Sequence, residues 1–491
     1  LKEKIAMRFR ALLSAFIVAI FGLGASINFA MAHVSEQGIV LLLPTNIYII
    51  SGCLAVIASM LLVALLPHDR VFSFFKPLQI RLPSFDVIFQ NQLLKDLMSI
   101  VALGIVLFLI VIGVVGSRDP LVNMLPLSIW TFWWIAIFMM HSVFGNIWAF
   151  INPWSGLYNR FLHHISLGVE LPRQIGCWPA IVIFVAFYAF IIADIAPDDP
   201  ARLANFVLGY VVFTFVGMII FGAERWFSQV ECFSILFALL SQLSPVKILP
   251  DGKGWQIGLP GWQALENRNI SMAQAFFLLS VLGSGSFDGV NETFWWLVQI
   301  DVNPLAFPGR SAVIWQSTLG IIGANLLLYL IFAICIWAGI KVVKKLRSVN
   351  DDTQDMQITF VDLFSVLAIS VLPIAAVYHA SHYLTTLMVN GQYLIAALSD
   401  PLGNGSNYLG LENYQVTTGY LNDIASVRRI WITQANLVVF GHVIAVLMAH
   451  FVIAERFKTW KEAAFFHIPI AIFMATYTWF GLWLLAAPKG A

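Results

Sequence analysis

About ten apolar runs, each long enough to cross a bilayer as a helix, occupy most of this chain of 491 residues. A helix needs about 20 apolar residues to cover the hydrocarbon core of a bilayer. Apolar residues make up 60% of the chain and charged residues only 11%. A water-soluble fold does not need apolar runs this long and this frequent. The sequence therefore predicts an all-α fold, a polytopic transmembrane helical bundle whose main partner is the lipid bilayer.

The predicted spans follow the apolar runs, and the basic residues between them predict their orientation in the membrane. Lys and Arg gather on the cytoplasmic side of membrane proteins. Basic clusters come after the first span, after residue 340 and after residue 454, and all three lie inside if residue 33 lies outside. This orientation requires that residues 270–300 do not cross the membrane. The spans are 46–66, 96–115, 126–149, 178–196, 203–222, 227–245, 312–340, 359–379, 430–454 and 466–486.

Residues 1–32 have the features of a signal peptide or of a first transmembrane helix. Four basic residues precede an apolar run, and the run ends in Ala30-Met31-Ala32, a small-x-small cleavage site. Cleavage would leave His33 at the new N-terminus and 33–491 as the polytopic membrane domain. An uncleaved first helix is the alternative.

Two segments are predicted to face outward, about 247–311 and about 400–428. In the first, the sequence GSGSFDG at 283–289 interrupts an apolar stretch with glycine, serine and a carboxylate. Irregular backbone at membrane depth is tolerated only where protein or water covers it. We therefore expect a break here, such as a re-entrant or interfacial hairpin. The second segment opens with the turn-forming sequence DPLGNG at 400–405.

The composition excludes several functions. The formal net charge is +1, so no overall field attracts nucleic acid. The four cysteines are scattered without a CxxC pair, which argues against a disulfide framework or a cysteine zinc site. The chain has no G-x-S-x-G, Walker A or H-E-x-x-H sequence, so nothing supports a serine hydrolase or an ATPase.

The strongest candidate for metal chemistry is the histidine pair at the outward end of span 359–379. His379 and His382 are three residues apart and share one face of a helix. Two imidazoles at this spacing can hold one divalent metal ion, zinc or copper. Tyr383 follows directly and is a candidate catalytic residue. In the alternative interpretation, these side chains mark the interface by hydrogen bonding to headgroups or water.

His442 is a further candidate metal ligand, near the middle of its span. Ionisable groups at that depth are costly and usually face the bundle interior. Gln434 and Asn436 lie nearer the outer end of the same predicted helix, so the three predict a polar lane. The alternative is a helix-packing histidine bonded to a neighbouring carbonyl.

Acidic residues predicted near the outer side add oxygen ligands. Asp288 and Asp400 are the candidates that would orient a metal-bound water, because such an ion lowers the pKa of its water. His33, if cleavage frees its amine, would chelate copper together with one more histidine. The full acidic set is Asp194, Asp198, Asp199, Asp288, Glu292, Asp301 and Asp400.

Several stretches carry a family resemblance that is spread over most of the chain. They are HASHYLTTLMVNGQYLIAALSDPLGNG (379–405), FGHVIAVLMAH (440–450), ATYTWFGLWLL (475–485), INPW (151–154), FGAERW (221–226) and SFDG (286–289). These stretches resemble a bacterial membrane family known as fenitrothion hydrolases or as hypothetical membrane proteins. The resemblance implies a multi-pass protein of the bacterial inner membrane that hydrolyses organophosphate esters. It depends on His382, Tyr383, Asp400 and His442.

Three hypotheses of function follow. In the first, a metal held by His382, with His379 and His442, activates water against a small-molecule phosphotriester near the periplasmic face. In the second, the polar lane makes the protein a transporter or channel. In the third, His33 makes it a copper-handling or redox membrane subunit. Whether another membrane subunit completes the site is left open by the sequence.

Overall fold

The structure is a computed structural model, and it describes residues 38–65, 72–80, 91–249, 254–306, 309–349, 359–411, 414–457 and 459–489. Helices make up nearly all of the secondary structure in these residues, which confirms the predicted all-α bundle. The predicted signal segment 1–32 and His33 lie outside the described residues.

Eight helical segments of the described chain are long and apolar enough to cross a membrane. A ninth is added if the bent pair α13 (Ala223–Gln229) and α14 (Cys232–Leu240) counts as one span, whereas α11 (Trp178–Ala193) is shorter. Each of the ten predicted spans overlaps one of these helices. The chain is therefore a multi-pass membrane protein. The eight segments are α3 (Thr45–Leu65), α6 (Gln92–Val115), α7 to α8 (Met124–Phe144), α12 (Pro200–Phe221), α18 (Ile314–Val349), α19 to α20 (Phe360–His382), α22 (Ile424–Arg456) and α23 (Trp460–Ala486).

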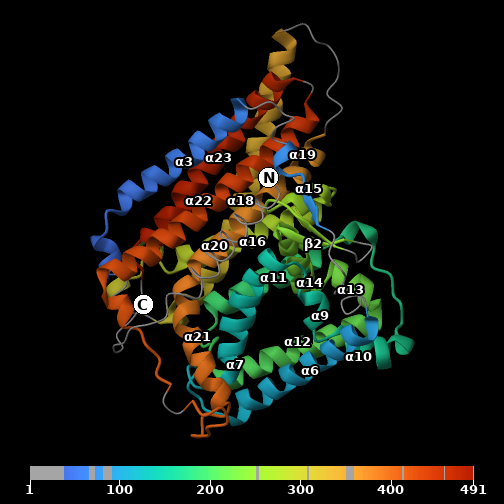
Figure 1. Ribbon diagram of the computed structural model, residues 1–491, viewed down its shortest axis with the longest axis vertical. Coiled ribbons are helices and arrows are strands. Elements are labelled where there is room, and N and C mark those ends of the chain that lie inside the picture. Colours follow the sequence, from blue (N-terminus) through green and yellow to red (C-terminus); the bar gives the residue numbers. More distant parts are fainter. Residues whose placement is uncertain are drawn as a thin grey trace.

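The helices pack in two neighbouring groups. α3, α22 and α23 lie side by side, and α18 packs along α23 (Figure 1). α6 and α12 pack against each other in the second group (Figure 1). Three further helices are α15 (Trp262–Glu266), α17 (Phe294–Gln299) and α21 (Leu384–Ser399). A small antiparallel sheet has the strand order β1-β3-β2, with β1 at Leu78–Ile80, β3 at Trp255–Ile257 and β2 at Val246–Ile248.

The breaks between helices have local causes in the sequence. α13 and α14 meet at 68°, and the fully buried carboxylate of Glu231 caps α14 by accepting the N–H groups of Phe233 and Ser234. This cap satisfies backbone donors that begin a helix without intrahelical partners. A 3₁₀ turn separates α19 (Phe360–Ala368) from α20 (Leu372–His382), where Pro373 lacks an N–H for a continuous helix.

The expected break in the glycine- and serine-rich segment 283–289 is wrong. α16 (Met272–Asn291) is a continuous helix through this segment, and most of its residues are buried. It begins with a capping box between Ser271 and Gln274. Its glycines let side chains of neighbouring helices approach closely, since an added Cβ would lie 2.6 Å from Asn325 at Gly283 and 2.1 Å from Tyr378 at Gly289.

The two ends of α16 lie against opposite ends of α23, so 247–311 is not confined to one end of the bundle. Before α16, Arg268 forms an ion pair of 2.9 Å with Glu455, close to where α22 ends and α23 begins. After α16, Glu292 forms an ion pair of 3.0 Å with Lys489, which follows α23. A helix of 20 residues is about 30 Å long, the thickness of a bilayer core.

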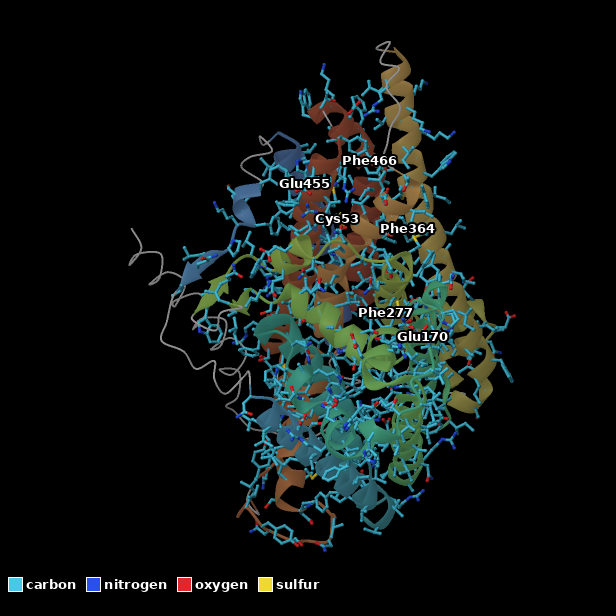
Figure 2. All side chains as sticks on the ribbon, turned by 90° about the vertical axis from the view of Figure 1, so that its right-hand side faces the viewer. Cys53, Glu170, Phe277, Phe364, Glu455 and Phe466 are labelled. Atoms are coloured by element: carbon cyan, nitrogen blue, oxygen red, sulfur yellow. The ribbon has the colours of Figure 1, made fainter. Side chains whose placement is uncertain are left out.

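The bundle core lies around α16. Phe277 of α16, Phe364 of α19 and Phe466 of α23 are fully buried and belong to one contiguous apolar cluster (Figure 2). α16 therefore occupies an interior position, packed against α11, α18, α19 and α20. Polar side chains on this helix are held away from lipid by its neighbours.

Candidate metal centre

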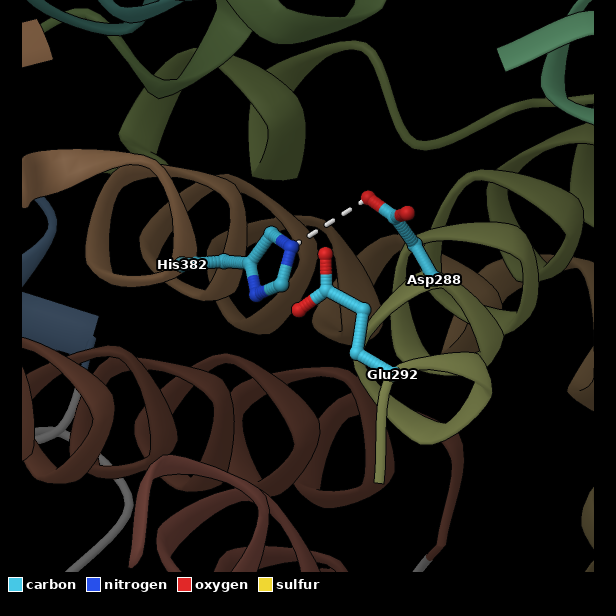
Figure 3. Close-up of side chains that lie close together, drawn as sticks. All are labelled: Asp288, Glu292 and His382. Atoms are coloured by element: carbon cyan, nitrogen blue, oxygen red, sulfur yellow. Dashed lines mark ion pairs between the residues drawn. The ribbon is translucent and has the colours of Figure 1, made fainter. Parts of the chain in front are cut away.

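Three potential metal ligands converge where α16 and α20 end. Asp288 and Glu292 are four residues apart on α16 and the residue that follows it, so their carboxylates share one face. His382 is the last residue of α20. One ligand atom from each of the three lies within 4.8 Å of the others, and the side chains point toward one another (Figure 3). We call Asp288, Glu292 and His382 the triad.

The distances within the triad suit a small metal ion. His382 Nε2 lies 3.3 Å from Asp288 Oδ2 (Figure 3). Two ligands of one tetrahedral zinc ion are ~3.3 Å apart when each bond is about 2.0–2.1 Å. The Asp288 and His382 side chains are only 8% and 7% exposed, whereas Glu292 is 44% exposed. The triad is therefore buried on one side and accessible from the side of Glu292.

The carboxylate of Glu292 is paired with an internal cation. Lys489 Nζ lies 3.0 Å from Glu292 Oε2. The backbone supports this contact, because Lys489 forms an antiparallel bridge with Thr293 and Pro488 accepts the N–H of Phe294. An ion that binds all three ligands has to displace the Lys489 ammonium from Glu292.

Two tyrosines of the α20 end surround the triad. The Tyr383 hydroxyl donates a hydrogen bond to Asp288 Oδ2. The Tyr378 ring stacks on the His382 ring, with centroids 5.8 Å apart and planes 10° apart. Side chains that hold ligands in this way fix their orientation and tune their basicity. Tyr383, predicted as a catalytic residue, thus contacts a ligand of the triad.

His379 does not lie in the triad, contrary to the predicted histidine pair. Its Nε2 is 3.0 Å from the carbonyl oxygen of Trp134, and its ring stacks on Phe138 with centroids 3.8 Å apart. Trp134 belongs to a π-helical stretch of the α7–α8 segment. His379 therefore joins α20 to that segment. His382 points the other way, toward α16.

His442 and Asp400 also lie outside the triad. His442 Nδ1 is 2.8 Å from the carbonyl oxygen of Val438, one turn earlier on α22. The carboxylate of Asp400 accepts the backbone N–H groups of Asn404 and Gly405 in its own turn. Among the described residues, only the triad gathers three such ligands at metal-binding spacing. The described structure therefore does not bring His379 and His442 together with His382.

The predicted polar lane on α22 is not formed either. Gln434 is buried, and its Nε2 donates to the backbone carbonyl of Ser381 on α20. Ser381 Oγ in turn donates to the backbone carbonyl of Gln434. Asn436 is exposed on another side of the helix. These contacts give Gln434 a packing role between α20 and α22.

Sequence reasoning missed Glu292 as a ligand, although it belonged to the acidic set. The spacing of four from Asp288 was the available signal. The predicted break in 283–289 hides this relation, because residues four apart share a face only where the helix is continuous. Lys489 had no comparable signal, because it lies 197 residues from Glu292 in the sequence.

The fold and the triad define a class, a multi-pass membrane protein with a candidate metal-binding site at the end of a buried helix. Comparison of the chain with protein-family models, with curated proteins and with solved structures gave no match.

Proposed function

We propose that this protein is a metal-dependent hydrolase of the bacterial inner membrane that acts on organophosphate triesters. The triad of Asp288, Glu292 and His382 is the observation that carries the proposal. The substrate class is what the resemblance of the quoted sequence stretches to fenitrothion hydrolases implies. The two-carboxylate, one-imidazole ligand set favours zinc, because zinc binds nitrogen and oxygen ligands together.

Three protein ligands are typical of catalytic rather than structural zinc sites, which leave a coordination position for water or substrate. The bound ion would lower the pKa of that water and polarise the phosphoryl oxygen. Asp288 then serves as a ligand, and the Tyr383 hydroxyl keeps its carboxylate in place. This differs from the role of water orientation expected for Asp288 from sequence.

The location of the triad favours an apolar substrate. A neutral phosphotriester partitions into lipid, and the triad lies in a helical bundle whose outer helices carry many exposed apolar side chains. Glu292, at 44% exposure, marks the accessible side. A substrate dissolved in the bilayer or at its surface reaches the triad from that side.

The test combines metal analysis with an activity assay on detergent-purified full-length protein. We expect about one zinc ion per chain and hydrolysis of a nitrophenyl phosphotriester. His382→Ala and Glu292→Gln are expected to lose both, because each removes one of three ligands. Wild-type protein without bound metal, or full hydrolysis by metal-free His382→Ala, would overturn the proposal.

A further inference from the structure

We propose that Tyr378 is a ligand-contacting residue of the triad site, and that its hydroxyl donates a hydrogen bond to an oxyanion bound there. The chemical class of ligand is a phosphoryl oxyanion, such as inorganic phosphate or a phosphodiester. This inference rests on the proposed metal site and adds the ligand class and one contacting residue.

The Tyr378 hydroxyl lies against the last turn of α16, at the residue next in sequence to Asp288. It lies over Gly289 of α16, where an added Cβ atom would be 2.1 Å from the Tyr378 oxygen. Gly289 follows Asp288 directly and lies less than one turn before Glu292. The absence of a Cβ at residue 289 is what permits this close approach.

The hydroxyl is also held at a fixed place. The Tyr378 ring stacks on His382, the third member of the triad. Tyr378 is 5% exposed, within the apolar core. A phenol fixed on two sides cannot swing away from the triad without breaking this packing.

Tyr378 differs from its neighbouring tyrosines in its hydrogen bonding. Within the described residues, its buried hydroxyl has no hydrogen-bonding partner. The Tyr383 hydroxyl donates to Asp288, and the Tyr477 hydroxyl pairs with Ser286. A buried polar group without a partner is costly, and such groups often serve a ligand. Tyr378 is thus the phenol whose donor is available to a ligand.

Charge identifies the class of that ligand. The Tyr378 hydroxyl is a hydrogen-bond donor. A divalent ion in the triad would add two positive charges beside it. Donors and cations arranged in this way stabilise a negatively charged oxygen. In triester hydrolysis, the water oxygen bonds to phosphorus, the ester P–O bond breaks, and the proton released by water ends on the departing alcohol or phenol. The Tyr378 bond would strengthen as the phosphoryl oxygen gains charge.

The test measures the binding of inorganic phosphate to cobalt-loaded full-length protein in detergent, followed by the visible absorption of Co²⁺. We expect Tyr378→Phe to keep the wild-type cobalt stoichiometry and to weaken phosphate binding at least tenfold. Tyr477→Phe is the matched control, because it removes a part-buried tyrosine hydroxyl of α23 that already has a partner, Ser286 of α16. It should bind phosphate as the wild type does.

The outcomes separate this inference from the proposed function. Equal phosphate affinity in wild type and Tyr378→Phe, with cobalt bound in both, overturns the role of Tyr378 while the metal site stands. Absence of cobalt from the wild type overturns both. A tenfold loss of phosphate binding in a protein that does not hydrolyse triesters upholds the oxyanion contact and refutes the hydrolase assignment.

Discussion

The hydroxyl of Tyr378 lies so close to Gly289 that a methyl group at residue 289 would stand 2.1 Å from the phenolic oxygen. α20 can approach α16 at this point only because residue 289 has no side chain. The same contact joins Tyr378 to the helix that carries two of the three triad residues. Packing and the candidate site are therefore coupled through one glycine.

Gly289→Ala is expected to lower the free energy of unfolding by about 1–3 kcal/mol, because overpacking forces the Tyr378 ring or α16 to move. In a Tyr378→Phe background the same change should cost much less, since the clashing oxygen is gone. Chemical denaturation in detergent measures both effects. Gly391→Ala is the control, because an added Cβ there meets no atom within 4 Å. Equal losses in both backgrounds would contradict the contact.

Lys489→Met is expected to tighten zinc binding ~3-fold, because removing an exposed ion pair changes free energy by less than about 1 kcal/mol. The physical reason is that the Lys489 ammonium competes with the metal for Glu292. Competition with a chelating dye measures the affinity. Lys247→Met, which removes a similar pair with Glu266 elsewhere, should leave zinc affinity unchanged. Weaker zinc binding in Lys489→Met would show that the ammonium helps the site instead.

His442→Ala is expected to keep the wild-type metal content while losing about 2–4 kcal/mol of stability through the cavity left in a packed interior. His442 is 1% exposed and bonded within its own helix. Metal analysis and denaturation of the same preparation measure the two properties. His382→Ala provides the contrast, with metal lost. Loss of metal in His442→Ala would show that His442 is needed for metal binding.

Asp194→Asn is expected to lower the thermal midpoint at pH 7. The bidentate hydrogen bonds from the Arg202 guanidinium hold the pKa of the Asp194 carboxyl below its usual value. A carboxyl with a lowered native pKa stabilises the fold above its unfolded pKa, about 3.9. The stabilisation is lost as the pH falls through the lower native pKa. Midpoints of wild type and variant should therefore converge in strong acid. A difference that is constant with pH would exclude this pair as the cause.

Much of the fold could be predicted, because apolar length alone identifies spans. Apolar length did not predict α16 as one continuous helix. Its glycines, serines and Asp288 lower its hydropathy, yet the surrounding helices bury them. High hydropathy identifies helices that contact lipid, whereas α16 contacts other helices of the protein. The expected break in 283–289 was wrong for that reason, whereas the side of the membrane on which 270–300 lies stays a prediction.

The candidate site was predicted in part. Asp288 and His382 were chosen from residue type and position, and they lie 3.3 Å apart. His379 was chosen with His382 because three residues place two side chains on roughly one face. The actual rotation of α20 turns His379 toward Trp134. Which of two neighbouring histidines faces α16 depends on the packing of α20, and periodicity carries no such information.

The strand-like contact between Thr293 and Lys489 sets an order of assembly. A ribosome produces His382, the last member of the triad, before it produces α21, α22 and α23, and only then Lys489. During that interval the two carboxylates and the imidazole already exist in the nascent chain, and no ammonium yet competes for Glu292. The contact of Lys489 with Glu292 can therefore form only after all three triad residues have been synthesised.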